Sequence, residues 1–290
     1  MTTRTGHISP CFPTWIMLSL LLTFGLGACD NTVEPIVENE TDFFAVYGFL
    51  DTDADTQFVR VSAVRPTLEP GPGSVQAAVE SFVLSTGHRV GWQDSLVRLD
   101  DGQPGVLFYA PMQVHPGEIH RMEIRRTDNA TTRAVASVPS RILLDVAPMQ
   151  EDFNQRFVQR VTLLDQRRLP HSLHIRYRVS LPNAAEPETI VLPFFTSFNA
   201  TSRGIELIVH LENDREEVLR RLDLPPFDST LVLHSVGLEI EQLSEEWDTP
   251  ETALNIEHGF GFFGARARSI ERWTLPDTTL LRLGYTPPPS

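Results

Sequence analysis

Residues 172–181 read SLHIRYRVSL and carry the clearest structural pattern in the chain. The apolar residues from Leu173 to Leu181 alternate with polar ones such as His174 and Arg176. A period of two places one face of a β-strand on a core and the other face in water. This stretch therefore predicts a strand in an antiparallel sheet that has one solvated face.

Short apolar runs bounded by turn residues lie on both sides of this strand, as is typical of chains built from many short strands. The sequence NDREEVLRRL at 213–222 has early acidic residues and late arginines, which favour a short helix. A second helical turn is predicted at 244–247. The other predicted strands are 43–50, 56–64, 79–86, 96–99, 106–110, 118–126, 131–138, 157–164, 189–198, 205–211, 230–240, 268–275 and 279–285.

These elements predict an all-β fold in two domains. The strands within 42–139 have the number and spacing of an N-terminal immunoglobulin-like β-sandwich. Residues 140–290 are predicted to form a second, mainly antiparallel β domain with one or two short helices. Pro139 and Ser140 mark the boundary between the two domains.

The composition narrows the class of protein. With 290 residues, of which 41% are hydrophobic, the chain can bury one or two cores. It contains no lysine, so all 24 basic residues are arginine, against 38 acidic residues and a net charge of -14. An acidic surface repels phosphate groups, and nucleic acid is therefore not expected as a partner. The missing lysines fit GC-rich coding and also a salty habitat.

The amino terminus predicts export and lipidation. Residues 15–24 form an apolar stretch of about ten residues, the length of a signal-peptide core and too short to span a bilayer. The sequence LGAC at 26–29 follows, which is an aliphatic residue, two small residues and a cysteine. This pattern resembles the lipobox of bacterial lipoproteins. We expect residues 1–28 to be a cleaved signal peptide and Cys29 to be the lipidation site.

Two consequences follow from cleavage before Cys29. The only other cysteine, Cys11, lies in the cleaved segment, so a disulfide or a cysteine-based catalytic or metal site is not expected. Loss of Arg4 leaves 23 basic against 38 acidic residues, a charge of -15 that would not attract anionic lipids. The acyl chains on Cys29 must therefore supply the membrane affinity. Residues 29–41 are acidic and rich in turn formers, which predicts a flexible tether.

Two stretches resemble a known family. Residues 44–50 read FAVYGFL and are followed by FVRVS at 58–62, while NIEHGFGFFGA stands at 255–265. Both resemble the lipoproteins of Bacteroidota-type bacteria grouped as domain of unknown function 4249. The resemblance implies an outer-membrane lipoprotein that is often encoded beside TonB-dependent receptors, without an established enzymatic activity or defined site residues. In addition, PGEIHRM at 116–122 is similar to a strand start common in immunoglobulin-like domains, with His120 where tyrosine is usual.

The glycine and phenylalanine segment at 255–265 is the main candidate site. Glycine permits a positive φ or a close approach of two backbones, while phenylalanine fills a core or lines a groove. Two interpretations stay open: a kinked buried strand that holds the second domain together, and a partner-binding loop. The residues concerned are Asn255, Gly259, Phe260, Gly261, Phe262, Phe263 and Gly264.

Other candidates for chemistry are weaker. Asp51, Asp53 and Asp55 alternate as calcium ligands do, but Thr56 stands where a calcium loop needs glycine. An acidic hairpin tip is the preferred interpretation of these residues. Trp92 and Trp247 are candidates for stacking on sugars, although each is more often a core or rim residue. No metal site and no cofactor are expected.

These observations favour a non-enzymatic, membrane-anchored lipoprotein of the cell envelope, in the outer membrane of a Gram-negative bacterium. It is expected to act as a binding or accessory protein beside a TonB-dependent transporter. The alternative is a lipid-anchored hydrolase or carbohydrate-binding protein. A hydrolase would need histidines such as His171, His210, His234 or His258 to cluster with a carboxylate.

Overall fold

The computed structural model describes most of the chain from Asp42 onward. The described residues are 42–64, 75–98, 102, 104–153, 156–182, 184, 186–194, 198–247 and 255–289. All of them belong to one compact unit, Glu40–Ser290.

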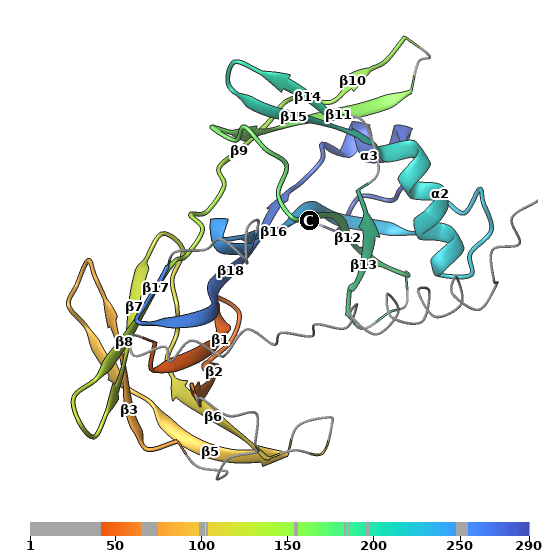
Figure 1. Ribbon diagram of the computed structural model, residues 1–290. Coiled ribbons are helices and arrows are strands. Elements are labelled where there is room, and N and C mark those ends of the chain that lie inside the picture. Colours follow the sequence, from red (N-terminus) through yellow and green to blue (C-terminus); the bar gives the residue numbers. More distant parts are fainter. Residues whose placement is uncertain are drawn as a thin grey trace, which may run out of the picture. The chain divides into compact units, whose positions relative to one another are not determined.

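Within the described residues, the strands form one eight-stranded sheet and two five-stranded sheets (Figure 1). The eight-stranded sheet has the order β13-β12-β16-β18-β1-β2-β6-β5. Its strands are β1 (Phe44–Asp51), β2 (Thr56–Ala63), β5 (Gln93–Arg98), β6 (Pro104–Pro111), β12 (Ser172–Ser180), β13 (Glu188–Pro193), β16 (Val232–Leu243) and β18 (Gly259–Trp273). This confirms the predicted all-β fold class, and β12 coincides with the alternating stretch at 172–181.

The first core lies between one half of the eight-stranded sheet and a five-stranded sheet of order β17-β8-β7-β3-β4. The strands of this second layer are β3 (Ala77–Val83), β4 (Arg89–Gly91), β7 (Ile119–Arg126), β8 (Thr131–Ser137) and β17 (Ile256–Glu257). Phe44, Phe108, Met122 and Phe263 are among its fully buried side chains. We call this half of the molecule the first sandwich.

The second core lies under the other half of the eight-stranded sheet. It is covered by β9 (Leu144–Val146), β10 (Gln150–Glu151), β11 (Phe157–Leu164), β14 (Phe198–Thr201) and β15 (Gly204–His210), and by the helix α2 (Leu211–Arg221). Ile175 and Tyr177 of β12 point into this core, while Arg178 between Tyr177 and Val179 is exposed. The alternation that predicted this strand therefore follows from its two different faces.

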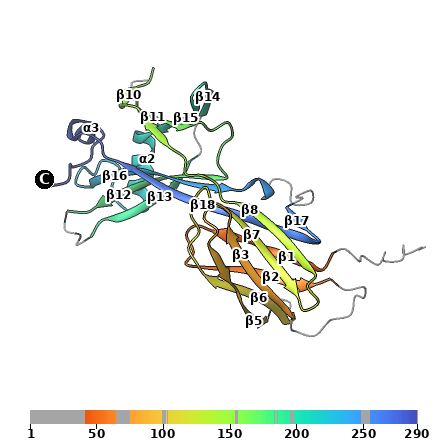
Figure 2. The ribbon, with the colours of Figure 1, turned by 90° about the vertical axis from the view of Figure 1, so that its left-hand side faces the viewer.

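One strand belongs to both cores. The first half of β18 pairs in parallel with β1, from Gly259 beside Phe44 to Arg266 beside Asp51. Its second half pairs antiparallel with β16, from Arg266 to Trp273. Figure 2 shows this long strand running from the first sandwich into the second half of the fold.

This shared strand corrects the predicted domain limits. The prediction assigned all of 140–290 to the second domain, but β17 pairs with β8 and Phe263 is buried in the first core. The chain thus returns to the first sandwich more than a hundred residues after leaving it. Sequence spacing alone does not reveal such a return, because strand pairing over this distance leaves no local pattern.

The carboxyl-terminal prediction was wrong in another way. Residues 279–285 were expected to form a strand, but Asp277–Arg282 form the helix α3. Pro276 precedes its first turn, which contains Asp277, and Leu280 and Leu283 are buried while Leu281 is exposed. This is helical spacing with a favourable start.

The predicted helix at 213–222 is confirmed as α2, and the turn at 244–247 is the 3₁₀ helix η1 (Glu245–Trp247). Among the described residues, no helix is long and apolar enough to cross a membrane.

The glycine at 261 allows β1 and β18 to pair. Gly261 has a φ of 122°, a conformation that other residues rarely adopt. A Cβ atom at this position would lie 2.1 Å from the carbonyl oxygen of Val46 on β1. Any side chain here would therefore force the two strands apart.

We predict that Gly261→Ala destabilises the protein by about 2 kcal/mol or more, because it combines backbone strain with overpacking. Urea unfolding measures this difference. Gly91→Ala is the matched control, since a Cβ atom at Gly91 meets nothing within 4 Å. Equal stability of the two variants would contradict the role assigned to Gly261.

Candidate functional site

The outer face of the first sandwich carries a group of aromatic side chains. Because Phe44, Val46 and Leu50 of β1 point into the core, Tyr47 and Phe49 between them point outward. The register places Phe49 beside Phe58 of β2, and Phe58 beside Tyr109 of β6. Neighbouring strands lie about 4.8 Å apart, so these rings form a row across the sheet.

These rings are unusually exposed for their size. The exposed fraction is 48% for Tyr47, 54% for Phe58 and 47% for Phe260, and Phe49 is exposed at 37%. Arg60, which pairs in register with Tyr47, is also exposed on this face. We define the aromatic face as Tyr47, Phe49, Phe58, Arg60, Tyr109, Trp247, Phe260 and Phe262.

Trp247 of η1 supports one end of the aromatic face. Its ring centroid lies 4.7 Å from that of Phe262 and 5.5 Å from that of Phe49, both in edge-to-face geometry. Its indole N–H donates to the carbonyl oxygen of Ala265 at 3.1 Å. A Cβ atom at Gly264 would lie 2.9 Å from the indole nitrogen, so this glycine leaves room for the tryptophan. Trp247 is therefore held in place by β18 and is only partly exposed.

The candidate segment 255–265 is divided between the two faces of β18. Phe263 is buried, whereas Phe260 and Phe262 lie on the aromatic face. Asn255 fixes the start of the segment, since its side-chain amide donates to the carbonyl oxygens of Val135 at 2.8 Å and Phe263 at 2.5 Å. The segment therefore has a buried side, as the interpretation as a structural strand requires. It also has exposed rings, as the interpretation as a partner-binding loop requires.

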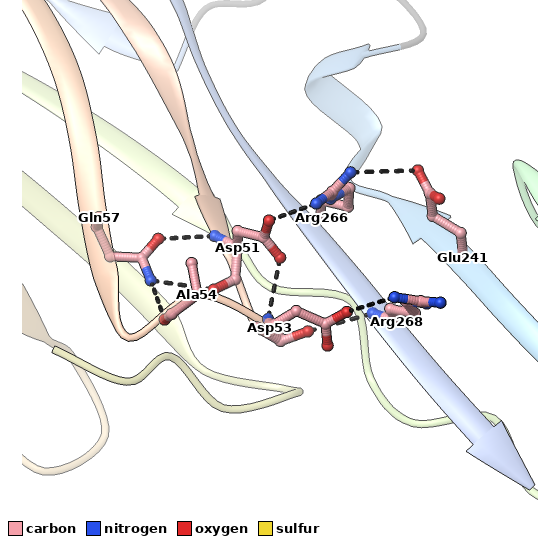
Figure 3. Close-up of polar contacts among 8 residues, drawn as sticks. Asp51, Asp53, Ala54, Gln57, Glu241, Arg266 and Arg268 are labelled. Carbon is pink, nitrogen blue, oxygen red and sulfur yellow. Dashed lines mark hydrogen bonds and ion pairs between the residues drawn. The ribbon is translucent and has the colours of Figure 1, made fainter.

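Two of the three residues considered for calcium, Asp51 and Asp53, are engaged with arginines (Figure 3). Arg266 of β18 binds the carboxylate of Asp51 and lies 4.0 Å from that of Glu241. Arg268 lies 3.3 Å from the carboxylate of Asp53. The turn is closed by the backbone N–H of Asp53, which donates to the Asp51 carboxylate at 3.0 Å. Guanidinium groups thus supply the positive charge that a cation would bring.

The same arginines continue into the second half of the sheet. Arg268 also contacts Glu239 of β16 at 2.5 Å, and Glu239 binds Arg176 of β12. Burial raises the pKa of Glu239, but the two arginines outweigh burial and hold it below its ordinary value. The carboxylate of Asp55 accepts a hydrogen bond from the side-chain amide of Gln113 at 3.2 Å. Each carboxylate of the predicted acidic tip therefore contacts another side chain. Among the described residues, no group of three histidine, cysteine, aspartate or glutamate side chains is placed to hold a metal ion.

Titratable groups meet at another place that the sequence prediction missed. A cavity of about 460 Å³ in the first sandwich is lined by His88, His115, Glu118 and His120, among others. The His120 imidazole is 1% exposed, and its Nε2 lies 3.0 Å from the Glu118 carboxylate. The same carboxylate accepts a hydrogen bond from the backbone N–H of His115 at 2.9 Å. Glu118 immediately precedes β7 and stands two residues before His120, and in extended backbone this spacing places both side chains on the same side.

Burial and hydrogen bonding together determine the protonation of this pair. Burial lowers the pKa of His120 below 6.5, and the nearby Glu118 carboxylate does not fully offset this effect. Burial also raises the pKa of Glu118, but the hydrogen bonds from His115 and His120 outweigh burial and leave it below 4.5. The pair is therefore a neutral imidazole beside a carboxylate at neutral pH, and the remaining nitrogen of His120 is buried without a partner in the described structure.

The four histidines considered for a hydrolase lie on separate elements. His234 contacts the hydroxyl of Ser180 at 2.8 Å, and the ring of His258 lies 6.0 Å from that of Phe43. His210 precedes α2 near Asp214, whose carboxylate accepts a hydrogen bond from the buried Tyr177 at 2.6 Å. His171 lines a different surface cavity. In the described structure, these four histidines do not form the cluster that the hydrolase alternative needs.

Of the remaining candidates, the structure places Trp92. Trp92 is 8% exposed, and its indole N–H donates to the hydroxyl of Ser81 at 2.9 Å, so it is a core residue and not a stacking surface. The predicted lipidation site Cys29 and the tether at 29–41 lie outside the described residues.

We predict that the protein loses stability between about pH 7.5 and about pH 5.5, in part because of His120. The pKa of His120 is lower in the folded than in the unfolded chain, so acidification protonates the unfolded chain first and favours it. Partial burial lowers the pKa of His234 as well, which acts in the same direction. Urea unfolding at both pH values should show a smaller loss for His120→Gln. An unchanged loss in this variant would contradict the role of His120.

Comparisons with known proteins give little further guidance. No family model matches the chain, and no curated protein matches it either. Among solved structures, the crystal structure of bovine butyrophilin is similar at 13% sequence identity, over 80% of this chain and 99% of its own length. The TM-score of 0.22 is too low to support a conclusion about function.

Proposed function

We propose that this chain is a membrane-anchored lipoprotein without enzymatic activity, and that it acts as a binding or accessory protein of the outer membrane. Its partner is proposed to be a TonB-dependent receptor. The lipobox-like sequence before Cys29 and the resemblance to domain of unknown function 4249 support the anchor and the location.

The observation that carries the proposed binding activity is the exposure of the aromatic face. Protein interfaces are enriched in tyrosine, phenylalanine, tryptophan and arginine, and their strongest contacts concentrate on tryptophan, tyrosine and arginine. The aromatic face combines these residue types on a rigid sheet, with Trp247 held between Phe49 and Phe262. A rigid surface loses little conformational entropy on binding, which favours affinity.

The place of the aromatic face in the chain fits a partner in the same membrane. Fifteen residue steps separate Cys29 from Phe44, the first residue of β1. At about 3.5 Å per residue, this length of chain spans at most about 50 Å. The face would therefore operate close to the bilayer that holds the anchor.

The anchor gives the first test of the proposed function. We predict that Cys29→Ala moves the protein from the membrane fraction to the soluble fraction, because the acidic body has no attraction of its own for anionic lipids. Cell fractionation followed by a salt wash measures this. If Cys29→Ala protein still sediments with membranes after the wash, the lipoprotein assignment is wrong.

The second test uses the scarcity of cysteine. The only cysteines in the sequence are Cys11 and Cys29, so a cysteine introduced elsewhere provides a specific thiol after lipidation of Cys29. We predict that Phe58→Cys, treated with a thiol-reactive cross-linker in intact cells, joins to an outer-membrane receptor that mass spectrometry identifies. Ile119→Cys is the matched control, because Ile119 is 42% exposed on the other sheet. Equal cross-linking at both positions, or none at position 58, would refute the binding face.

A further inference from the structure

A second surface feature lies in the other half of the molecule, away from the aromatic face. A cavity of about 590 Å³ opens between α2, residues 224–227 and α3. This volume lies within the range of small-molecule sites. Its apolar lining includes Leu219, Leu224 and Leu283, of which Leu219 and Leu283 are almost completely buried.

The wall that contains Phe227 is held rigidly. The guanidinium of Arg215 donates to the carbonyl oxygens of Pro226 at 3.3 Å, Asp228 at 2.5 Å and Gly284 at 3.1 Å. One side chain of α2 therefore ties this loop to the turn after α3. The backbone N–H of Asp228 also donates to the carbonyl oxygen of Pro225 at 3.0 Å, which closes the loop around Phe227.

Phe227 is exposed in spite of this rigid support. Its side chain lines the cavity and is 94% exposed. A phenylalanine in a fixed loop loses hydrophobic stabilisation by facing water, and it gains that stabilisation when an apolar group covers it. Because the loop is already ordered, a ligand would not bear the entropic cost of fixing it.

The rim of the cavity is rich in arginine, although the whole chain is acidic. Arg220 and Arg282 line it, and their side chains are 72% and 60% exposed. Arg220 contacts Glu217 and Arg282 contacts Glu151, yet each guanidinium has five N–H donors and retains some for a ligand. The carboxylates of Glu212 and Glu216 also line the cavity and repel an anionic group. An anionic group is therefore favoured only beside Arg220 and Arg282.

We propose that this cavity binds an amphiphile that has an acyl chain and an anionic headgroup, with a free fatty acid as the ligand. The acyl chain lies against Leu224 and Phe227, and the carboxylate is bound by Arg220 or Arg282. Charge-assisted hydrogen bonds from a guanidinium to the carboxylate fix the orientation of the ligand, with the headgroup at the rim of the cavity. This proposal does not depend on the partner of the aromatic face.

Calorimetric titration of the full chain carrying Cys29→Ala with sodium decanoate, below the concentration at which it forms micelles, tests the site. We expect saturable binding with one site per chain. Phe227→Ser should weaken decanoate binding about tenfold or more, because the substitution removes the aromatic ring that the acyl chain covers. Phe58→Ser is the matched control, since Phe58 is an exposed phenylalanine on the aromatic face and should leave decanoate binding unchanged.

The headgroup is tested with decan-1-ol, which lacks the charge. We expect decanol to bind about tenfold more weakly than decanoate, and Arg220→Gln with Arg282→Gln to remove that difference. The absence of saturable decanoate binding, or equal binding by Phe227→Ser and the parent chain, would overturn the proposal. Binding to phosphatidylglycerol vesicles without binding to decanoate would overturn the fatty acid and identify a membrane phospholipid as the source of the headgroup.

Discussion

The structure depends on the pairing of β18 with two different neighbours. Its first half lies parallel to β1, and its second half lies antiparallel to β16, so both cores rest on the backbone of one fifteen-residue strand. Parallel pairing requires a long connection, and here nearly the whole described chain forms it. Neither core can therefore be completed until the last long strand is in place.

Arginines stabilise the point at which β18 passes from one core to the other. Arg266 and Arg268 bind carboxylates from the β1–β2 turn on one side and from β16 on the other. A guanidinium presents five donors in a planar fork, so a single arginine can bind two carboxylates at once, which a lysine does with less geometric precision. In a chain without lysine and with 38 acidic residues, such shared contacts reduce the repulsion among carboxylates.

Local pattern was sufficient to predict most of the longer strands, but not the short ones such as β4, β9 and β10, and not the pairing partners. β12 followed from its alternation, and β11 from an apolar run bounded by turn residues, because each pattern is contained within the element. The return of β17 and β18 to the first sandwich could not be predicted, since β17 pairs with a strand more than a hundred positions earlier and β18 with one more than two hundred positions earlier. The helix α3 was missed although its signals were present, because two adjacent leucines fit a strand as well as a helix.

The candidate sites show the same limit of prediction. The segment 255–265 was recognisable from its glycines and phenylalanines, but only the register with β1 separates Phe263, which is buried, from Phe260 and Phe262, which join the aromatic face. Phe227 gave no signal in the sequence, because its exposure depends on three carbonyl contacts from a single arginine on α2. In both places a rigid backbone holds an aromatic ring in water. Covering such a ring with a ligand or a partner would remove this cost, and this is the physical argument on which both proposed binding sites rest.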